Sequence, residues 1–441
     1  MNVPPIKAPV RSLAIGAAAL FAATLSIVPA AGETQEGTAQ EKAEYCDVAG
    51  NWLALPEREP VAHTEILEDL ARKRVVLLGE THDDAEHHRW QLHTLAALHG
   101  RGKPLVIGLE MFPRAAQPVL DKWVRGELSR EDFLASAGWT RIWGYPSGLY
   151  MPIFDFARMH RIPMKALNVE RGLVARVGRE GWDAVPEPER QGVSTPAPAS
   201  QGYQRMLAEV YALKEAMPSG DPGKDAKTPD HQIEIDDAKL AEFQQKDDFR
   251  NFVAAQQVWD RAMAQALAEA SKEQGDALVV AIVGSGHVEG GFGIRHQLED
   301  LGMTEAATAI PVGKGEPCET VDDNYSDAIF VVDDRSADTP PAPKLGVRLA
   351  VASAGAGVKV EAVGPGSIAE TAGLKKGDRI VQAAGTALDA APDLIEVVTR
   401  QAPGTWLPLQ VRRDEETLDL VAKFPAKPGE APAQAEDGGQ E

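Results

Sequence analysis

Short, uninterrupted apolar runs recur along much of the chain, and longer mixed segments separate them. Runs of this kind, bounded by Gly or Pro, are typical of strands buried on both faces of a parallel sheet. Strands that alternate with helices predict an α/β domain over residues 45–332, with a mostly parallel sheet and helical insertions. The predicted strands span 74–79, 105–110, 163–168 and 277–284, and the predicted helices span 84–98, 117–123 and 131–137.

Two segments depart from this pattern. Residues 182–228 are dense in Pro, Gly, Ser and charge, which predicts an insertion or lid around a helix at 201–217. Residues 235–274 predict one long helix, because large apolar side chains recur near helical spacing. We interpret that stripe as core packing rather than as a cofactor-binding surface; it contains Phe249, Phe252, Val253, Trp259, Met263 and Leu267.

A proline-rich segment, 333–344, predicts a linker to a smaller domain over 345–425. In that domain Gly373 is predicted to end a short helix, and Gly377 to turn the chain into the next strand. Asp393 is predicted to begin a second helix with apolar residues on one face. The tail, 426–441, is rich in Pro, Ala, Glu and Gly and is predicted to be disordered.

The N-terminus has the pattern of an exported protein. Lys7 and Arg11 precede an apolar run over 13–28, and small residues follow it. This pattern predicts a signal peptide over 1–30, cleaved near Ala30, then a polar lead-in over 31–44, and a periplasmic or secreted protein. An uncleaved membrane anchor is the alternative, although the apolar run is short for a membrane-spanning helix.

The net charge and the cysteines limit the partners and modifications that the sequence predicts. The formal net charge of −21 argues against binding to nucleic acid, because such binding needs basic patches. The two cysteines, Cys46 and Cys318, fit either one disulfide in an oxidising compartment or two free thiols. Neither directly follows the N-terminal apolar run, so the sequence predicts no lipid-attachment site.

Acidic and imidazole side chains follow three of the predicted strands. Glu80 and His82 follow the first, Glu110 ends the second, and His287 follows the strand at 277–284. Because ligands of a parallel sheet bind beyond the carboxyl ends of its strands, these four side chains are predicted to form one site. They could hold a divalent cation or a water for acid–base chemistry. Alternatively, Glu80 caps the following helix, and His82, His87, His88 and His93 form a solvated surface.

These residues resemble a known family. The motifs Leu78-Gly79-Glu80-Thr81-His82, Gly108-Leu109-Glu110-Met111-Phe112 and Gly284-Ser285-Gly286-His287 are similar to those of ChaN-type haem-binding proteins of the Tiki superfamily. The resemblance implies haem binding in iron uptake or handling, by a homodimer that holds haem face to face between two subunits. It also implies a tyrosine as axial ligand, for which Tyr150 is preferred over Tyr145, with Glu80, His82, Glu110 and His287 completing the cofactor site.

The same superfamily offers a second hypothesis. Tiki-type relatives are metal-dependent proteases with similar Gly-x-x-His elements. If the chain were such a hydrolase, Glu80, His82, Glu110 and His287 would be its catalytic residues around a metal-activated water. The cofactor would then be a divalent metal ion rather than haem.

The smaller domain resembles bacterial PDZ domains. The resemblance rests on the Leu345-Gly346-Val347 segment and on the pattern from Val360 through Gly385. It implies that a peptide or protein C-terminus adds as a strand, with its carboxylate on the amides of Leu345, Gly346 and Val347. No Gly-x-Ser-x-Gly nucleophile motif accompanies it.

Overall fold

The computed structural model describes residues 48–216, 235–314, 321, 323–333, 343–350, 357–388, 390–414 and 416–426. The predicted signal peptide, the polar lead-in, both cysteines, most of the linker and nearly all of the tail lie outside the described residues. Within the part that the structure describes, no helix has both the length and the apolar character needed to cross a membrane.

The larger domain is built on one eight-stranded sheet with the order β2-β1-β8-β7-β3-β6-β4-β5. The six strands from β8 to β5 run parallel, and β1 joins antiparallel to β8. The mostly parallel α/β fold predicted from the sequence is therefore confirmed. The strands are β1 Trp52–Ala54, β2 Glu59–Val61, β3 Val75–Leu78, β4 Leu105–Pro113, β5 Met164–Asn168, β6 Leu278–Ile282, β7 Ala306–Gly313 and β8 Ala328–Val332.

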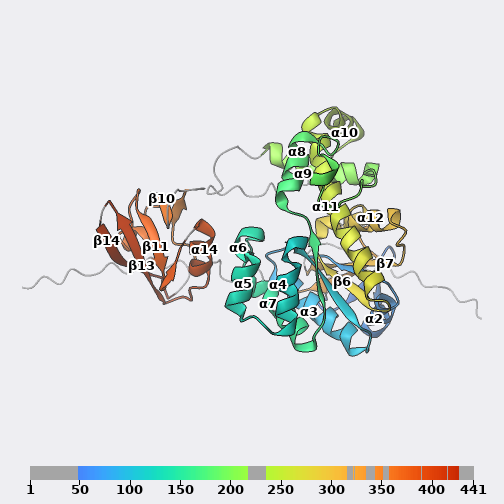
Figure 1. Cartoon of the computed structure of the whole chain (residues 1–441), viewed down its shortest axis with the longest axis horizontal. Helices are drawn as coiled ribbons and strands as arrows, with labels where there is room; N and C mark the ends of the chain where they lie inside the picture. Colours follow the sequence, from blue (N-terminus) through green and yellow to red (C-terminus); the bar gives the residue numbers. More distant parts are fainter. Residues whose placement is uncertain are drawn as a thin grey trace, which may run out of the picture. The chain divides into compact units, whose positions relative to one another are not determined.

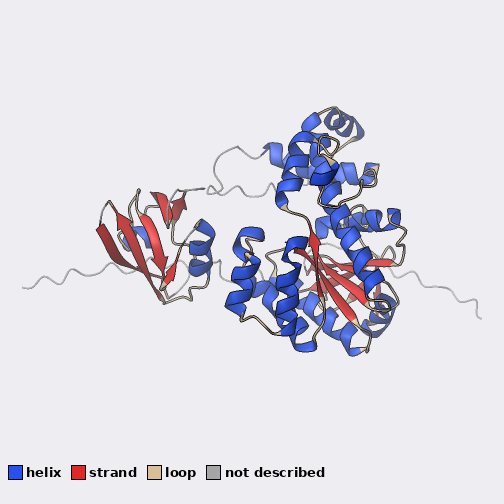
Figure 2. Cartoon of the chain, in the orientation of Figure 1, coloured by secondary structure: helices blue, strands red, loops and turns tan. Residues whose placement is uncertain are grey.

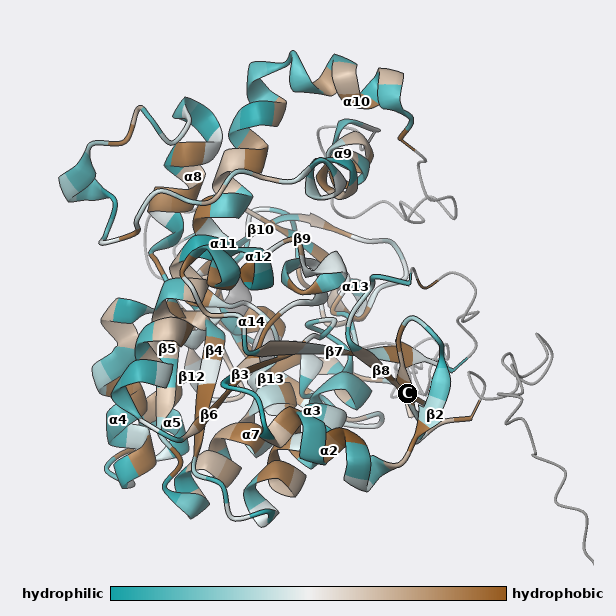
Figure 3. Ribbon diagram, turned by 90° about the vertical axis from the view of Figure 1, so that its right-hand side faces the viewer, coloured by the Kyte–Doolittle hydropathy of each residue, from teal (hydrophilic) through white to brown (hydrophobic). Residues whose placement is uncertain are grey.

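Helices cover both faces of this sheet (Figures 1 and 2). The apolar strand runs serve both sides: Val76 and Leu78 pack into one core, whereas Val75 and Leu77 pack into the other. Figure 3 shows the resulting hydrophobic colour along the central strands. The main covering helices are α2 His63–Ala71, α3 Ala85–Gly100, α4 Gln117–Arg125, α5 Arg130–Ala137, α6 Trp139–Ile142, α7 Ser147–His160, α11 Asp247–Glu273 and α12 Ile294–Asp300.

The predicted single helix over 235–274 is wrong, because the structure divides it into α10 (Asp237–Gln244) and α11. The amide of Lys246 bonds to the carbonyl of Phe243, which closes a turn between the two helices. This turn lets Phe243 of α10 and Phe249 of α11 pack in the same small core with Tyr203. Tyr203 belongs to α9 (Gln201–Ala216), the helix predicted within the insertion, and α8 (Arg171–Glu180) precedes it.

The smaller domain has its own sheet, in the order β14-β13-β11-β10-β9, and its own apolar core. Its short helix and the strand after Gly377 lie where the sequence predicts them, whereas the second helix begins at Ala391, two residues before Asp393. The elements are β9 Val347–Leu349, β10 Val358–Val363, α13 Ile368–Thr371, β11 Arg379–Ala383, β12 Thr386–Ala387, α14 Ala391–Thr399, β13 Trp406–Arg413 and β14 Glu416–Lys423.

Candidate functional site

The three chemistry-bearing strands are immediate neighbours, in the order β3-β6-β4. The amide of Ser285, after β6, bonds to the carbonyl of Glu80, after β3, at 2.9 Å. Glu110 comes directly after Leu109, the last β4 residue paired with β6. The structure therefore brings Glu80, His82, Glu110 and His287 to one rim of the sheet.

Glu80 is the centre of the first of two buried polar networks. One of its oxygens, Oε1, accepts a hydrogen bond from the Tyr150 hydroxyl at 2.6 Å and lies 2.9 Å from Nδ1 of His82. The other oxygen, Oε2, lies 3.1 Å from Nδ1 of His88, at an angle that does not qualify as a hydrogen bond. Glu80 does not cap α3, because Asp84 accepts the amide hydrogens at that helix start.

His87 and His88 are buried rather than part of a solvated surface. Nδ1 of His87 accepts the amide hydrogen of Thr81 at 2.9 Å, and Nε2 of His88 bonds to the carbonyl of His82 at 3.1 Å. Both imidazoles therefore hold the turn that carries Glu80 and His82.

The second network runs through His287. Its Nδ1 lies 2.6 Å from Asp260 of α11, and its Nε2 lies 3.6 Å from Glu110. Asp260 is fully buried and also accepts a hydrogen bond from the Tyr203 hydroxyl. Glu110 in turn accepts the amide hydrogen of Gly284 at 2.6 Å. A chain of polar contacts thus links α9 of the insertion to the rim of the sheet.

The two networks meet at Gly284. A Cβ atom at this position would lie 2.8 Å from Cε1 of His82 and 3.6 Å from Glu110. The distance to Glu110 is an ordinary contact, but the His82 ring would have to move. We therefore expect Gly284→Ala to displace His82 and to lower the free energy of unfolding by about 1–3 kcal/mol, measured by urea denaturation. Gly286→Ala is the matched control, since its Cβ would meet nothing within 4 Å. Equal stability of the two variants would contradict this account.

Opposing effects set the charge on these groups. Burial alone lowers the pKa of His287, but the charges of Asp260 and Glu110 raise it to about 9. Burial alone raises the pKa of Glu80, but the hydrogen bond from His82 and the adjacent His88 imidazole lower it to about 2. The rim therefore holds an ionised carboxylate and a protonated imidazole at neutral pH.

The raised pKa of His287 predicts a loss of stability in mild alkali. Its ordinary pKa is 6.5, so its stabilisation is complete below that pH and disappears as the pH rises through about 9. We expect the free energy of unfolding to fall by a few kcal/mol across this window. Denaturant titrations at several pH values should show the fall in the wild type and a flatter profile in His287→Gln.

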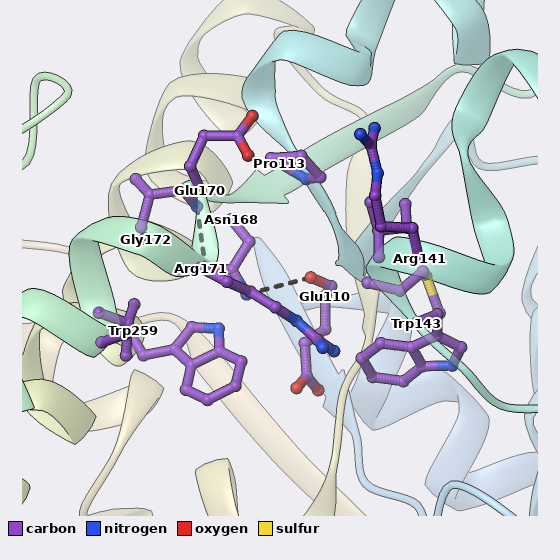
Figure 4. A pocket seen from close by; sticks show the side chains of 14 residues that line it. Glu110, Pro113, Arg141, Trp143, Asn168, Glu170, Arg171, Gly172 and Trp259 are labelled. Carbon is purple, nitrogen blue, oxygen red and sulfur yellow. Dashed lines mark hydrogen bonds between the residues drawn. The ribbon is translucent and has the colours of Figure 1, made fainter. Parts of the chain in front are cut away.

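A cavity of about 670 Å³ opens beside Glu110. Its walls come from the ends of β4 and β5, the first turns of α8, the end of α6 and the middle of α11. Two indoles stand in its wall: Trp143 packs edge-on against His82 at 4.6 Å, and Trp259 packs similarly against His287 at 5.4 Å. Figure 4 shows both indoles, with Glu110 and Arg171 directed between them.

The predicted tyrosines occupy different settings. Tyr150 lies inside α7, is 0% exposed and is held by Glu80. Tyr145 lies in the loop before α7 and is partly exposed. Its ring centroid is 5.1 Å from that of His82 and 5.5 Å from that of Trp143.

Sequence reasoning missed several residues of this region. Trp259 packs against the core, as predicted, but it also lines the cavity, whereas Phe249, Met263 and Leu267 of the same stripe are buried in the core. Asp260 was not assigned a site role, although a lone acid within an apolar helical stripe was a usable signal. Arg171 gave no sequence signal.

The four rim side chains do not form a metal-binding cluster. Among the residues that the structure describes, no group of three or more His, Cys, Asp or Glu side chains is arranged to hold a metal ion. One oxygen of each carboxylate is held by protein groups: Oε1 of Glu80 contacts Tyr150 and His82, and Oε2 of Glu110 accepts from Gly284.

Comparison with known proteins identifies the families of both domains. Residues 66–298, more than half of the chain, match the family described as "Haem-binding uptake, Tiki superfamily, ChaN". The chain belongs to the ChaN family. Residues 343–423 match the PDZ domain family. No curated protein sequence matches the chain.

The ChaN-like domain is also similar to solved structures. One is ChaN of Campylobacter jejuni, described as showing cofacial haem binding, at 17% identity, with 64% of this chain and 96% of that chain covered and a TM-score of 0.45. An erythromycin esterase mutant matches at 11% identity, with 59% and 77% covered and a TM-score of 0.34. The PDZ domain is similar to that of HtrA3, solved with a phage-derived ligand, at 27% identity, with 18% and 82% covered and a TM-score of 0.17.

The PDZ domain places its predicted peptide-binding residues at an open edge. β9, which begins at Val347, is the last strand of its sheet in the described part of the chain. Gly346 has a φ of +82°, and a Cβ atom there would lie 2.3 Å from Cβ of Ser367. Glycine is therefore needed for this loop to approach the start of α13.

Proposed function

We propose that the ChaN-like domain binds haem in the cavity beside Glu110 and serves in haem or iron uptake and handling. The observation that carries this proposal is the cavity itself, in a member of a haem-binding family. Its volume suits a ligand of this size. Its walls are largely apolar, which suits a porphyrin body; they include Met111, Ile142, Trp143, Val169, Val174, Ala175 and Trp259.

Tyr145 is the axial ligand in this proposal, in place of Tyr150. A phenolate oxygen is a suitable ligand for the ferric iron of haem. Tyr145 is partly exposed next to Trp143 of the cavity wall, whereas the Tyr150 hydroxyl is buried and donates to Glu80. Burial and the neighbouring Glu80 also raise the pKa of Tyr150 far above its usual range. Tyr150 and Glu80 then act as supports for His82 rather than as iron ligands.

Titration of the purified protein with haem tests the proposal. We expect a Soret band that saturates at a defined stoichiometry. Absence of any spectral change with ferric or ferrous haem would reject the proposal.

Size-exclusion chromatography with and without haem would test the homodimer that the family resemblance implies, in which two subunits hold haem face to face. Processing of the N-terminus and recovery from the periplasm would test export.

The metal-dependent hydrolase is the less favoured alternative. One oxygen of each carboxylate, Oε1 of Glu80 and Oε2 of Glu110, already accepts a hydrogen bond from a protein group. Chelator-sensitive peptidase activity, together with indifference to haem, would restore this alternative.

For the PDZ domain we propose binding of a peptide or protein C-terminus. The support is the position of β9 as the last strand of its sheet among the residues that the structure describes, next to the loop formed by Leu345 and Gly346, where a strand can add and a carboxylate can meet backbone amides. Peptides with a free carboxylate should bind, and the same peptides with an amidated C-terminus should not. Equal binding of both forms would reject carboxylate capture.

A further inference from the structure

Arg171 is an exposed cation in the wall of the cavity, where it lies near two indoles and the carboxylate of Glu110. It is the first residue of α8, and Figure 4 shows its side chain directed between Trp143 and Trp259. Within the described part of the chain, its guanidinium makes no hydrogen bond or ion pair with another residue. Two other polar residues of the cavity do have partners: Asn168 donates to the carbonyl of Glu110 at 3.1 Å, and the Glu110 carboxylate accepts from Gly284.

A second cation lies at the rim of the cavity. Arg141, from α6, also lines the cavity, and its guanidinium reaches back over Gly138, where a Cβ atom would lie 3.2 Å from it. It too has no hydrogen bond or ion pair with another residue in the part of the chain that the structure describes. The carboxylate of Glu170 is nearby in sequence, but in Figure 4 it points away from the guanidinium of Arg171.

The positive charge of Arg171 also acts on Tyr145, the proposed iron ligand. Burial raises the pKa of Tyr145, as do Asp83 and Glu110, and Arg171 is the neighbour that lowers it. A cation in this position lies within reach of both the cavity and the loop before α7.

Unpaired guanidinium groups are suited to carboxylates, since they bind them with two parallel charge-assisted hydrogen bonds. We propose that Arg171, with Arg141 at the rim, forms a carboxylate-binding subsite for the propionate groups of the tetrapyrrole. This inference rests on the proposed haem-binding function and extends it. The protein recognises its ligand as an apolar ring with an anionic edge, and this recognition does not depend on iron.

The subsite can be tested with two probes, metal-free protoporphyrin IX and its dimethyl ester. Binding of each to the full-length protein is measured by quenching of tryptophan fluorescence. The ester keeps the ring but removes both negative charges, and neither probe can use an axial ligand. We expect the free acid to bind at least about 10-fold more tightly than the ester, as for a charge-assisted contact. Arg171→Met should weaken binding of the free acid by about 10-fold and leave the Kd of the ester unchanged, which isolates the interaction.

The variants carry their own controls. Arg179→Met removes an exposed arginine from the same helix and should change neither Kd. Arg171→Lys keeps the charge and should restore part of the preference for the free acid. Equal binding of acid and ester by the wild type would overturn the subsite while leaving haem binding intact. Failure of the wild type to bind haem or either porphyrin would overturn both proposals.

Discussion

Tyr145→Phe is expected to weaken ferric haem binding by at least about 10-fold, equivalent to 1.4 kcal/mol, and to change the absorption spectrum of any haem that remains bound. The reason is the loss of the only oxygen that Tyr145 can offer to the iron. Tyr145 is partly exposed in a loop, so its hydroxyl contributes little to folding, and the melting temperature should be nearly unchanged.

Tyr150→Phe should behave in the opposite way. The Tyr150 hydroxyl is buried and donates to Glu80 at 2.6 Å. Its removal leaves one oxygen of a buried carboxylate with less support, which costs about 1–3 kcal/mol of stability. The haem spectrum should keep the position and shape of the wild type. A lost spectrum in Tyr150→Phe with an intact one in Tyr145→Phe would return the ligand role to Tyr150. If only His82→Ala lost the spectrum, the ligand would be the imidazole.

The rim of the site could be predicted from the sequence because it depends on strand order and polarity alone. Each buried strand is an apolar run, and each run that ends in Glu or in a Gly-x-x-His element delivers that group to the same edge. Parallel strands need no further information to align their carboxyl ends. The same logic does not reach the short strands β1 and β2, which join the sheet beside β8, because three residues show no periodicity.

The assignment of roles within the site could not be predicted in this way. Tyr150 and Tyr145 are five residues apart, and a pattern cannot tell which one is buried. The answer depends on α7, which begins at Ser147 and carries Pro152 inside it. Packing against Trp139, Trp143 and His88 then encloses the Tyr150 ring. Similarly, the cavity position of Trp259 depends on contacts between elements distant in sequence.

The largest loss of stability is expected for Glu80→Ala. The carboxylate of Glu80 is almost fully buried and ionised, and it contacts Tyr150, His82 and His88 at once. Its removal takes the carboxylate acceptor from the Tyr150 hydroxyl and the His82 imidazole, and it removes the negative charge beside His88. Removing one partner of a buried ionic network lowers the free energy of unfolding by about 3–5 kcal/mol. Urea denaturation should show this loss, whereas Glu65→Ala, at an exposed acid on α2, should change stability by less than about 0.5 kcal/mol.

Glu80→Gln separates charge from shape in the same network. Glutamine keeps one acceptor oxygen for Tyr150 but removes the charge that raises the pKa of His82 and His88 against the effect of burial. Because the pKa of Glu80 falls from 4.5 to about 2 on folding, its stabilisation is present above about pH 4.5 and disappears as the pH falls towards 2. The wild type should therefore lose stability in this acid window more steeply than Glu80→Gln. If the stability of both variants fell in parallel with pH, the charge of Glu80 would not stabilise the fold. The turn that carries His82 would then be held by hydrogen bonds between neutral groups.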